Sequence, residues 1–123
     1  MKILIDTHIF LWMLSCPEKL KEIRCYELES PANEVFLSAI SIVELMIKSS
    51  IGKLNIKFNP LEMAEKMLVD ILDFSGTHAV ALGKMPFHHK DPFDRMIIAQ
   101  AITNKLVLMT DDSKFSKYNI KII

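Results

Sequence analysis

The chain has 123 residues, which predicts one domain, and half of its residues are hydrophobic, which is enough for a buried core. Its 15 basic and 15 acidic residues give a formal net charge of zero, so no strong basic field indicates nucleic-acid binding. This balance still allows a nucleic-acid substrate, because bound metal cations would add positive charge locally. With three glycines, the chain builds neither a GxGxxG motif nor a P-loop.

The cysteines and the apolar runs indicate a cellular compartment. Cys16 and Cys25 do not form a CxxC pair, and they look like ordinary thiols in a reducing cytosol rather than a disulfide framework. The first residues show no signal-peptide pattern, and no apolar run approaches membrane-spanning length. We therefore expect a cytoplasmic protein.

The first element of the chain ends on an acid. Lys2 to Ile5 contains three consecutive apolar residues, two of them β-branched, and predicts a short strand that is buried on both faces. Asp6 follows, and Thr7 to Leu14 predicts a helix. Ligands of open α/β sheets lie beyond the carboxyl ends of the strands, so Asp6 is a candidate site residue. The alternative is that Asp6 only caps the helix.

The remaining chain alternates helical and extended patterns, as in an α/β fold. Ser38 is a candidate helix cap, Pro17, Pro60 and Pro92 suit first helical turns, and His78 is expected to be structural. After residue 14, the predicted elements are a charged exposed helix at 18–29, a strand at 34–37, a helix at 39–51, a helix at 60–72, a brief strand or turn at 73–75, a short helix at 77–83, a helix from 92 through 101, a strand at 105–109 and an edge strand at 120–123.

A second unusual acid lies in the helix predicted at 39–51. Glu44 falls on one helical face with Ile40, Ile47 and Ile51. A glutamate within an apolar stripe is costly unless it is paired, hydrogen-bonded or metal-bound. The alternative is a capping box in which Glu44 reaches back to the amide of Ser41, and this requires the helix to start at Ser41.

Two further acidic positions complete the set. Asp91 is a predicted N-cap before Pro92, and Asp94 lies one turn into that helix on the face of Ile98. The alternative for Asp94 is favourable interaction with the helix dipole. The strand at 105–109 runs into Thr110, Asp111 and Asp112, and Phe115 is expected to anchor a short helix there. The first of these two aspartates suits a capping or solvent-facing role, and the second is expected to face the site.

The candidate site therefore contains Asp6, Glu44, Asp94 and one of Asp111 or Asp112. Clustered carboxylates repel one another unless a cation holds them. Oxygen ligands of this kind suit Mg²⁺ or Mn²⁺, as one or two ions. Such sites support attack by water on a phosphodiester.

At this point the chain resembles a known family, the PIN-domain ribonucleases, and within it the VapC-type toxins of bacterial toxin–antitoxin pairs. The resemblance covers essentially the whole chain. Its pieces are Leu4 to His8, Ser38 to Glu44, His89 to Arg95 with Ala99 to Ala101, and the Thr-x-Asp pattern of Thr110 to Asp112. It implies a three-layer α/β sandwich whose parallel sheet, in the order 3-2-1-4-5, is flanked by helices. One departure is Ser113, which stands where Pro is common in the family.

The resemblance also implies roles for individual residues and partners. It implies metal-dependent RNA cleavage in which Asp6, Glu44 and Asp94 hold a metal and Asp112 completes the site. Thr7 and Thr110 are expected to orient these acids. Contacts with RNA phosphates are expected from Arg95, His89 and Lys90, for which the alternative is a solvated loop. The implied protein partner is a VapB-type antitoxin. The implied assembly is a homodimer of the chain or a toxin–antitoxin hetero-oligomer.

Two other classes of protein remain as alternatives. A phosphoacceptor receiver domain has a similar length and binds Mg²⁺, but it needs paired acids after its first strand, where this chain has Asp6 alone. A non-catalytic PIN-like module would bind RNA or protein without cleaving it, and the presence of all four acids argues against this alternative.

Overall fold

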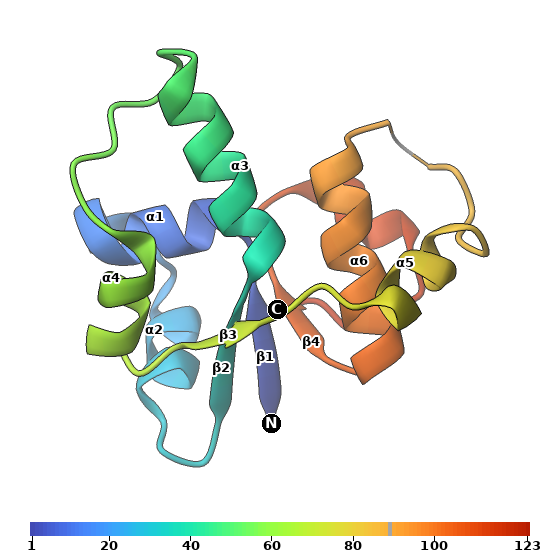
Figure 1. Cartoon of the computed structure of the whole chain (residues 1–123). Coiled ribbons are helices and arrows are strands. Elements are labelled where there is room, and N and C mark those ends of the chain that lie inside the picture. Colours follow the sequence, from blue (N-terminus) through green and yellow to red (C-terminus); the bar gives the residue numbers. More distant parts are fainter. Residues whose placement is uncertain (89) are drawn as a thin grey trace.

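The computed structural model of the chain describes residues 1–88 and 90–123. Within these residues, four parallel strands form one sheet in the order β3-β2-β1-β4 (Figure 1). The strands are β1 (Lys2–Ile5), β2 (Glu34–Ser38), β3 (Asp70–Leu72) and β4 (Val107–Met109). This confirms the predicted α/β fold and the order of the first four strands. It also excludes a receiver-type sheet, in which the first strand lies between the second and the third.

The predicted fifth strand is wrong in extent. Residues 120–123 make a single parallel bridge, between Leu108 and Ile122, rather than a strand. The segment before it is a turn, since the Ile120 N–H donates to the Tyr118 carbonyl, and pairing begins only at Lys121, whose carbonyl accepts from Leu108 N–H at 2.9 Å.

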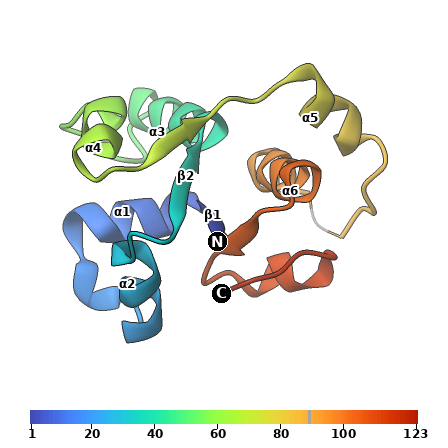
Figure 2. The ribbon, with the colours of Figure 1, turned by 90° about the horizontal axis from the view of Figure 1, so that it is seen from below.

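Helices cover both faces of the sheet. Figure 2 shows α1, α2 and α4 on one side and α5 and α6 on the other, and Figure 1 shows α3 continuing upward from the end of β2. The helices are α1 (Thr7–Ser15), α2 (Glu22–Glu29), α3 (Ala39–Ser50), α4 (Pro60–Lys66), α5 (Gly76–Leu82) and α6 (Pro92–Asn104), with 3₁₀ turns η1 (Pro17–Lys19) and η2 (Ser113–Lys117). None of the helices in the described residues is long and apolar enough to cross a membrane.

Alternation along β1 creates two cores. Ile3 and Ile5 pack with Phe10 of α1 on one face of the sheet, and Leu4 packs with Ile98 of α6 on the other. Side chains of a strand alternate between faces, and all three strand residues are fully buried. This burial on both faces confirms the three-layer arrangement.

Two helix predictions need correction. The helix predicted at 18–29 is interrupted, because Leu20 adopts an extended conformation between η1 and α2, and α2 contains a buried residue, Arg24. The helix predicted at 60–72 ends at Lys66, because Leu68 has a left-handed backbone (φ 58°). The residues after Leu68 then form β3, three residues earlier than the predicted strand or turn at 73–75.

Helix caps and one histidine behave as predicted. Ser38 caps α3 by accepting from the Ile40 N–H at 2.9 Å, and Asp91 caps α6 by accepting from the Phe93 N–H at 2.9 Å. His78 is buried, and its Nε2 lies 2.8 Å from Oδ1 of Asn104, which is a structural role. The predicted strand at 105–109 begins later, at Val107, because Lys105 has a left-handed backbone (φ 54°) and ends α6.

Candidate active site

Strand register brings three chain segments to one edge of the sheet. Ile5 pairs with Leu37 of β2 and with Met109 of β4, so the residues that follow these strands lie at the same level. The backbone N–H of Asp6 extends the ladder by donating to the Met109 carbonyl at 3.1 Å. Asp6 and Thr110 therefore lie side by side at the carboxyl end of the sheet.

Asp6 caps a helix and is also buried at the carboxyl end of the sheet. It is 5 % exposed, and its Oδ1 caps α1 by accepting from the Ile9 N–H at 2.8 Å. Its Oδ2 accepts a hydrogen bond from the Thr110 hydroxyl. Burial raises the pKa of Asp6 above its usual range, although the two hydrogen bonds oppose this shift. Since one carboxylate oxygen accepts more than one bond, capping leaves room for a further ligand.

Glu44 lies in α3 and is also 5 % exposed. The Thr7 hydroxyl lies 2.9 Å from Oε1 of Glu44 and is also within hydrogen-bond distance of the Ser41 hydroxyl. Oε2 of Glu44 pairs with Nζ of Lys48 at 2.6 Å. Because α3 starts at Ala39, the alternative capping box at Ser41 is wrong. The apolar stripe is also shorter than predicted, since its last members, residues 47 and 51, are exposed. Glu44 is thus buried by polar partners as well as by packing.

Asp94 lies in the first turn of α6 and is half-buried. Burial, followed by the negative charges of Asp91, Glu44, Asp112 and Asp6, raises the pKa of Asp94 to about 7. These charges come from four different places in the chain, and their effect shows that the predicted acids are electrostatic neighbours. The helix dipole alone would favour the ionised form and lower the pKa, which is the opposite direction.

The two consecutive aspartates after β4 lie in different surroundings. Asp111 pairs with the guanidinium of the buried Arg24, at 3.0 Å. Asp112 caps η2 by accepting from the Lys114 N–H at 2.9 Å, and its own N–H donates to the Thr110 hydroxyl oxygen at 3.1 Å. The capping role therefore belongs to the second aspartate, whereas the first is exposed, in agreement with the solvent-facing role that was the other expectation for it.

A single pocket of about 130 Å³ collects the acids, and we call it the carboxylate pocket. All four predicted acids line it, and Asp91 is a fifth. Two lysines also line it, so its formal charge is negative. Its lining residues are Asp6, Thr7, His8, Glu44, Lys48, Asp91, Asp94, Asp112, Lys114 and Phe115.

The sequence interpretation had not assigned Asp91 or the two lysines of this pocket to the site. A spacing signal existed for Lys48, which follows Glu44 by four residues on the same helix. Lys114 follows Asp112 by two residues. The sequence pattern of Asp91 predicts capping alone, and the structure shows that this residue both caps α6 and lines the pocket.

Two of the three predicted RNA contacts, Arg95 and Lys90, are not lining residues of the carboxylate pocket. Arg95 donates to the Pro86 carbonyl at 3.1 Å and lies over the ring of Phe87, with 4.9 Å to its centroid. Arg95 and Lys90 line a different pocket, of about 240 Å³. His89, the third predicted contact, lies outside the described residues.

The donor chemistry of the carboxylate pocket fits a hard divalent cation. Buried carboxylates supply oxygen ligands, and the raised pKa of Asp94 shows that positive charge is in deficit there. No group of three or more potential ligands in residues 1–88 and 90–123 is already arranged around one metal position. Oε2 of Glu44 is held by Lys48 in this structure.

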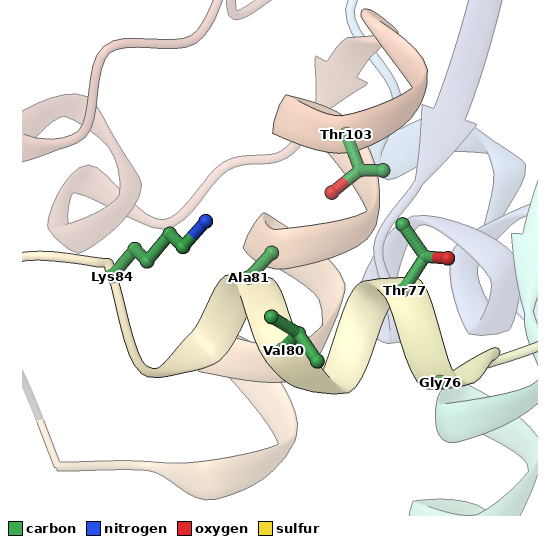
Figure 3. A pocket seen from close by; sticks show the side chains of 6 residues that line it. All are labelled: Gly76, Thr77, Val80, Ala81, Lys84 and Thr103. Carbon is green, nitrogen blue, oxygen red and sulfur yellow. The ribbon is translucent and has the colours of Figure 1, made fainter.

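A larger pocket, of about 580 Å³, lies between α5 and α6 (Figure 3). Its walls include Val80, Ala81 and Thr103, and Lys84 is the one charged residue among its lining residues. It has no acidic lining residue, so it offers none of the chemistry of the carboxylate pocket.

Comparison with known proteins agrees with the fold. The solved structure of VapBC2 from Rickettsia felis, bound to a DNA fragment from their promoter, contains a similar chain (TM-score 0.75, 20 % identity, 100 % of this chain and 98 % of that chain covered). DNA-bound VapBC from Salmonella typhimurium is also similar, with a TM-score of 0.69, 21 % identity, and coverage of 100 % of this chain and 97 % of that chain. FitAcB from Neisseria gonorrhoeae is similar too, with a TM-score of 0.63, 21 % identity, and coverage of 98 % of this chain and 96 % of that chain. No curated protein sequence matches significantly. The model of the PIN domain matches residues 3–121, and the chain therefore belongs to the PIN-domain family.

Proposed function

We propose that this protein is a metal-dependent endoribonuclease and the toxin of a type II toxin–antitoxin pair. The observation that carries this proposal is the carboxylate pocket, where five acids from four segments of the chain meet at the carboxyl end of the sheet. Membership of the PIN-domain family supports a nuclease, because PIN domains are generally nucleases. A structural likeness to chains of VapBC complexes supports the toxin assignment.

Asp6, Glu44 and Asp94 would hold Mg²⁺ or Mn²⁺, and Asp112 would complete the site. When bound, such a cation supplies a water of lowered pKa and offsets charge on the phosphate. The Thr110 hydroxyl and the Ile9 N–H orient the Asp6 carboxylate. Thr7 orients Glu44 in the same way.

The protein itself moves a proton at Asp94 when positive charge enters the pocket. With a pKa of about 7, this carboxyl is partly protonated at neutral pH. Positive charge beside Asp94 would favour its ionised form, so this carboxyl would give up its proton there. Lys48 neutralises Glu44 in this structure, and its ammonium group would contact an RNA phosphate if Glu44 served as a metal ligand instead.

The test of this function is cleavage of RNA by the purified protein in Mg²⁺ or Mn²⁺. We expect Asp94→Asn to lower the rate by at least about tenfold, or about 1.4 kcal/mol of transition-state stabilisation. Asp73→Asn is the matched control, because Asp73 is exposed and lies outside the carboxylate pocket. Equal rates for wild type, Asp94→Asn and Asp73→Asn would show that the cleavage does not come from this site.

A non-catalytic RNA-binding module is the second candidate. The observation that favours it is that the ligands of the described residues are not already arranged around one metal position. Bound RNA that remains intact in Mg²⁺ and in Mn²⁺ would establish this candidate over the nuclease.

The proposed protein partner is a small VapB-type antitoxin, which binds the chain in the cytoplasm as a toxin–antitoxin hetero-oligomer. Without the antitoxin, the chain would form a homodimer. The excess of negative charge in the carboxylate pocket would receive an Arg or Lys of that partner. Expression of the chain alone should arrest bacterial growth, and co-expression of the product of the neighbouring reading frame should relieve the arrest. Normal growth with abundant folded protein would contradict the toxin assignment.

A further inference from the structure

A second pocket, of about 330 Å³, adjoins the carboxylate pocket. The two pockets share Thr7, His8, Glu44 and Lys48, so they form one continuous depression over the start of α1 and the side of α3. The second pocket then extends to Lys53 and Leu54 in the segment after α3. We call it the lysine pocket.

The sign of the charge changes from one pocket to the next. The carboxylate pocket contains five acids, whereas Glu44 is the one acid among the lining residues of the lysine pocket. Glu44 is already paired with Lys48, so Lys53 gives the lysine pocket a net positive charge. The two adjoining pockets suit an elongated anion that carries more than one charged group. One charged group would lie in the lysine pocket, and another would lie in the carboxylate pocket when cations occupy it.

The backbone holds Lys53 at the wall of this pocket. Gly52 has a left-handed backbone (φ 77°) and reverses the chain after α3. The N–H groups of Lys53 and Leu54 then both donate to the Lys48 carbonyl, at 2.8 and 3.2 Å. The side chain of Lys53 is exposed and makes no ion pair with any residue that the structure describes, so its ammonium group is available to a ligand.

We propose that the lysine pocket binds the nucleotide next to the scissile phosphate, and that Lys53 contacts its phosphate group. This inference rests on the proposed ribonuclease function and names a binding subsite for its substrate. Lysine is a common ligand of backbone phosphates and contacts them without regard to base. Leu11 and Leu54, which are partly exposed, form an apolar wall on which the sugar or base of that nucleotide packs.

The test is binding of a short fluorescein-labelled single-stranded RNA to the full chain in Ca²⁺, a cation that also takes oxygen ligands, measured by fluorescence anisotropy with the RNA checked to be intact. Lys53→Ala should weaken binding about fivefold, which is the effect of one exposed charge pair. It should also reduce the slope of log affinity against log salt by about 0.7, the value for one phosphate contact with a single strand. Lys57→Ala is the control, because Lys57 is exposed in the same loop and is not a lining residue of this pocket.

Cleavage assays in Mn²⁺ separate this inference from the proposed function. Lys53→Ala should raise KM and leave kcat unchanged, and it should leave the stabilisation of the protein by Mn²⁺ unchanged, since Lys53 is not part of the carboxylate pocket. The variant should also fold, because the contact of Lys53 with α3 uses its backbone.

Each outcome decides one point. If wild type cleaves RNA and Lys53→Ala binds and cleaves like Lys57→Ala, the subsite is wrong and the proposed function stands. If Lys53→Ala weakens binding of the antitoxin but not of RNA, the pocket serves a protein partner and the inference is overturned. If wild type neither binds nor cleaves RNA, both the function and the subsite are wrong.

Discussion

The stability of the protein without metal should decrease as the pH rises, and Asp94 should be the main cause. The pKa of Asp94 is about 7 in the folded protein, against an ordinary value of 3.8. Between these values the folded state retains a proton that the unfolded chain has lost. Its contribution to stability is thus fully present below about pH 4 and is lost as the pH rises through about 7. Burial of Asp6 acts in the same direction.

The size of the effect follows from the two pKa values. At about 1.4 kcal/mol for each pKa unit, the difference sets an upper limit of about 4 kcal/mol. Asp94 is only half-buried, and water screens part of the repulsion from its neighbours. We therefore expect a loss of about 1–2 kcal/mol between about pH 5 and about pH 8.

Urea unfolding in EDTA at several pH values measures this loss. Asp94→Asn removes the titrating group at little change in shape, so this variant should be more stable than wild type at about pH 8 and similar to it at about pH 5. Asp73→Asn, which changes an exposed acid outside the pocket, should follow the wild type at every pH. A stability difference between wild type and Asp94→Asn that does not grow with pH would refute the reasoning.

Three further predictions follow from the surroundings of individual residues. Asp112→Asn should lower RNA cleavage by at least about tenfold, whereas Asp111→Asn should leave the rate within about threefold, as judged by single-turnover assays at saturating metal. Millimolar Mg²⁺ or Mn²⁺ should raise the melting temperature, and Asp6→Asn should remove most of the rise; equal responses would show that Asp6 does not bind the metal. Arg24→Ala should lower the free energy of unfolding by about 2–4 kcal/mol, measured in urea, because the buried Thr110 carbonyl loses its hydrogen-bond donor. Arg24→Lys should retain part of the lost stability.

The features that the sequence predicted correctly depend on residues within a few positions of one another. The apolar run of β1, the capping of α3 by Ser38 and the Asp91-Pro92 start of α6 are all local signals. Asp6 and Glu44 were also found locally, as acids at a strand end and within an apolar stripe. Their convergence in one pocket then follows from the parallel register, because all strand ends meet at one edge.

Other features depend on backbone conformations that ordinary residues rarely adopt. Leu68 has a left-handed backbone and ends α4, although its helical pattern continues to Leu72. Intrinsic preference disfavours this conformation for a residue with a side chain, so the sequence gives no warning of it. The buried Val69 and the pairing of β3 with β2 stabilise the arrangement after the turn.

The distinction between Asp111 and Asp112 comes from a residue that the sequence placed on an exposed helix. Arg24 pairs with Asp111 and donates to the Thr110 carbonyl at 2.7 Å, while the Thr110 hydroxyl donates to Asp6. A charged residue in a polar helix looks solvent-exposed, and the contact spans 86 residues of chain, so local patterns do not reveal it. Once Arg24 holds Asp111 on the side of α2, Asp112 is the acid left at the carboxylate pocket. The position of a candidate site residue thus depends on a buried ion pair outside the site.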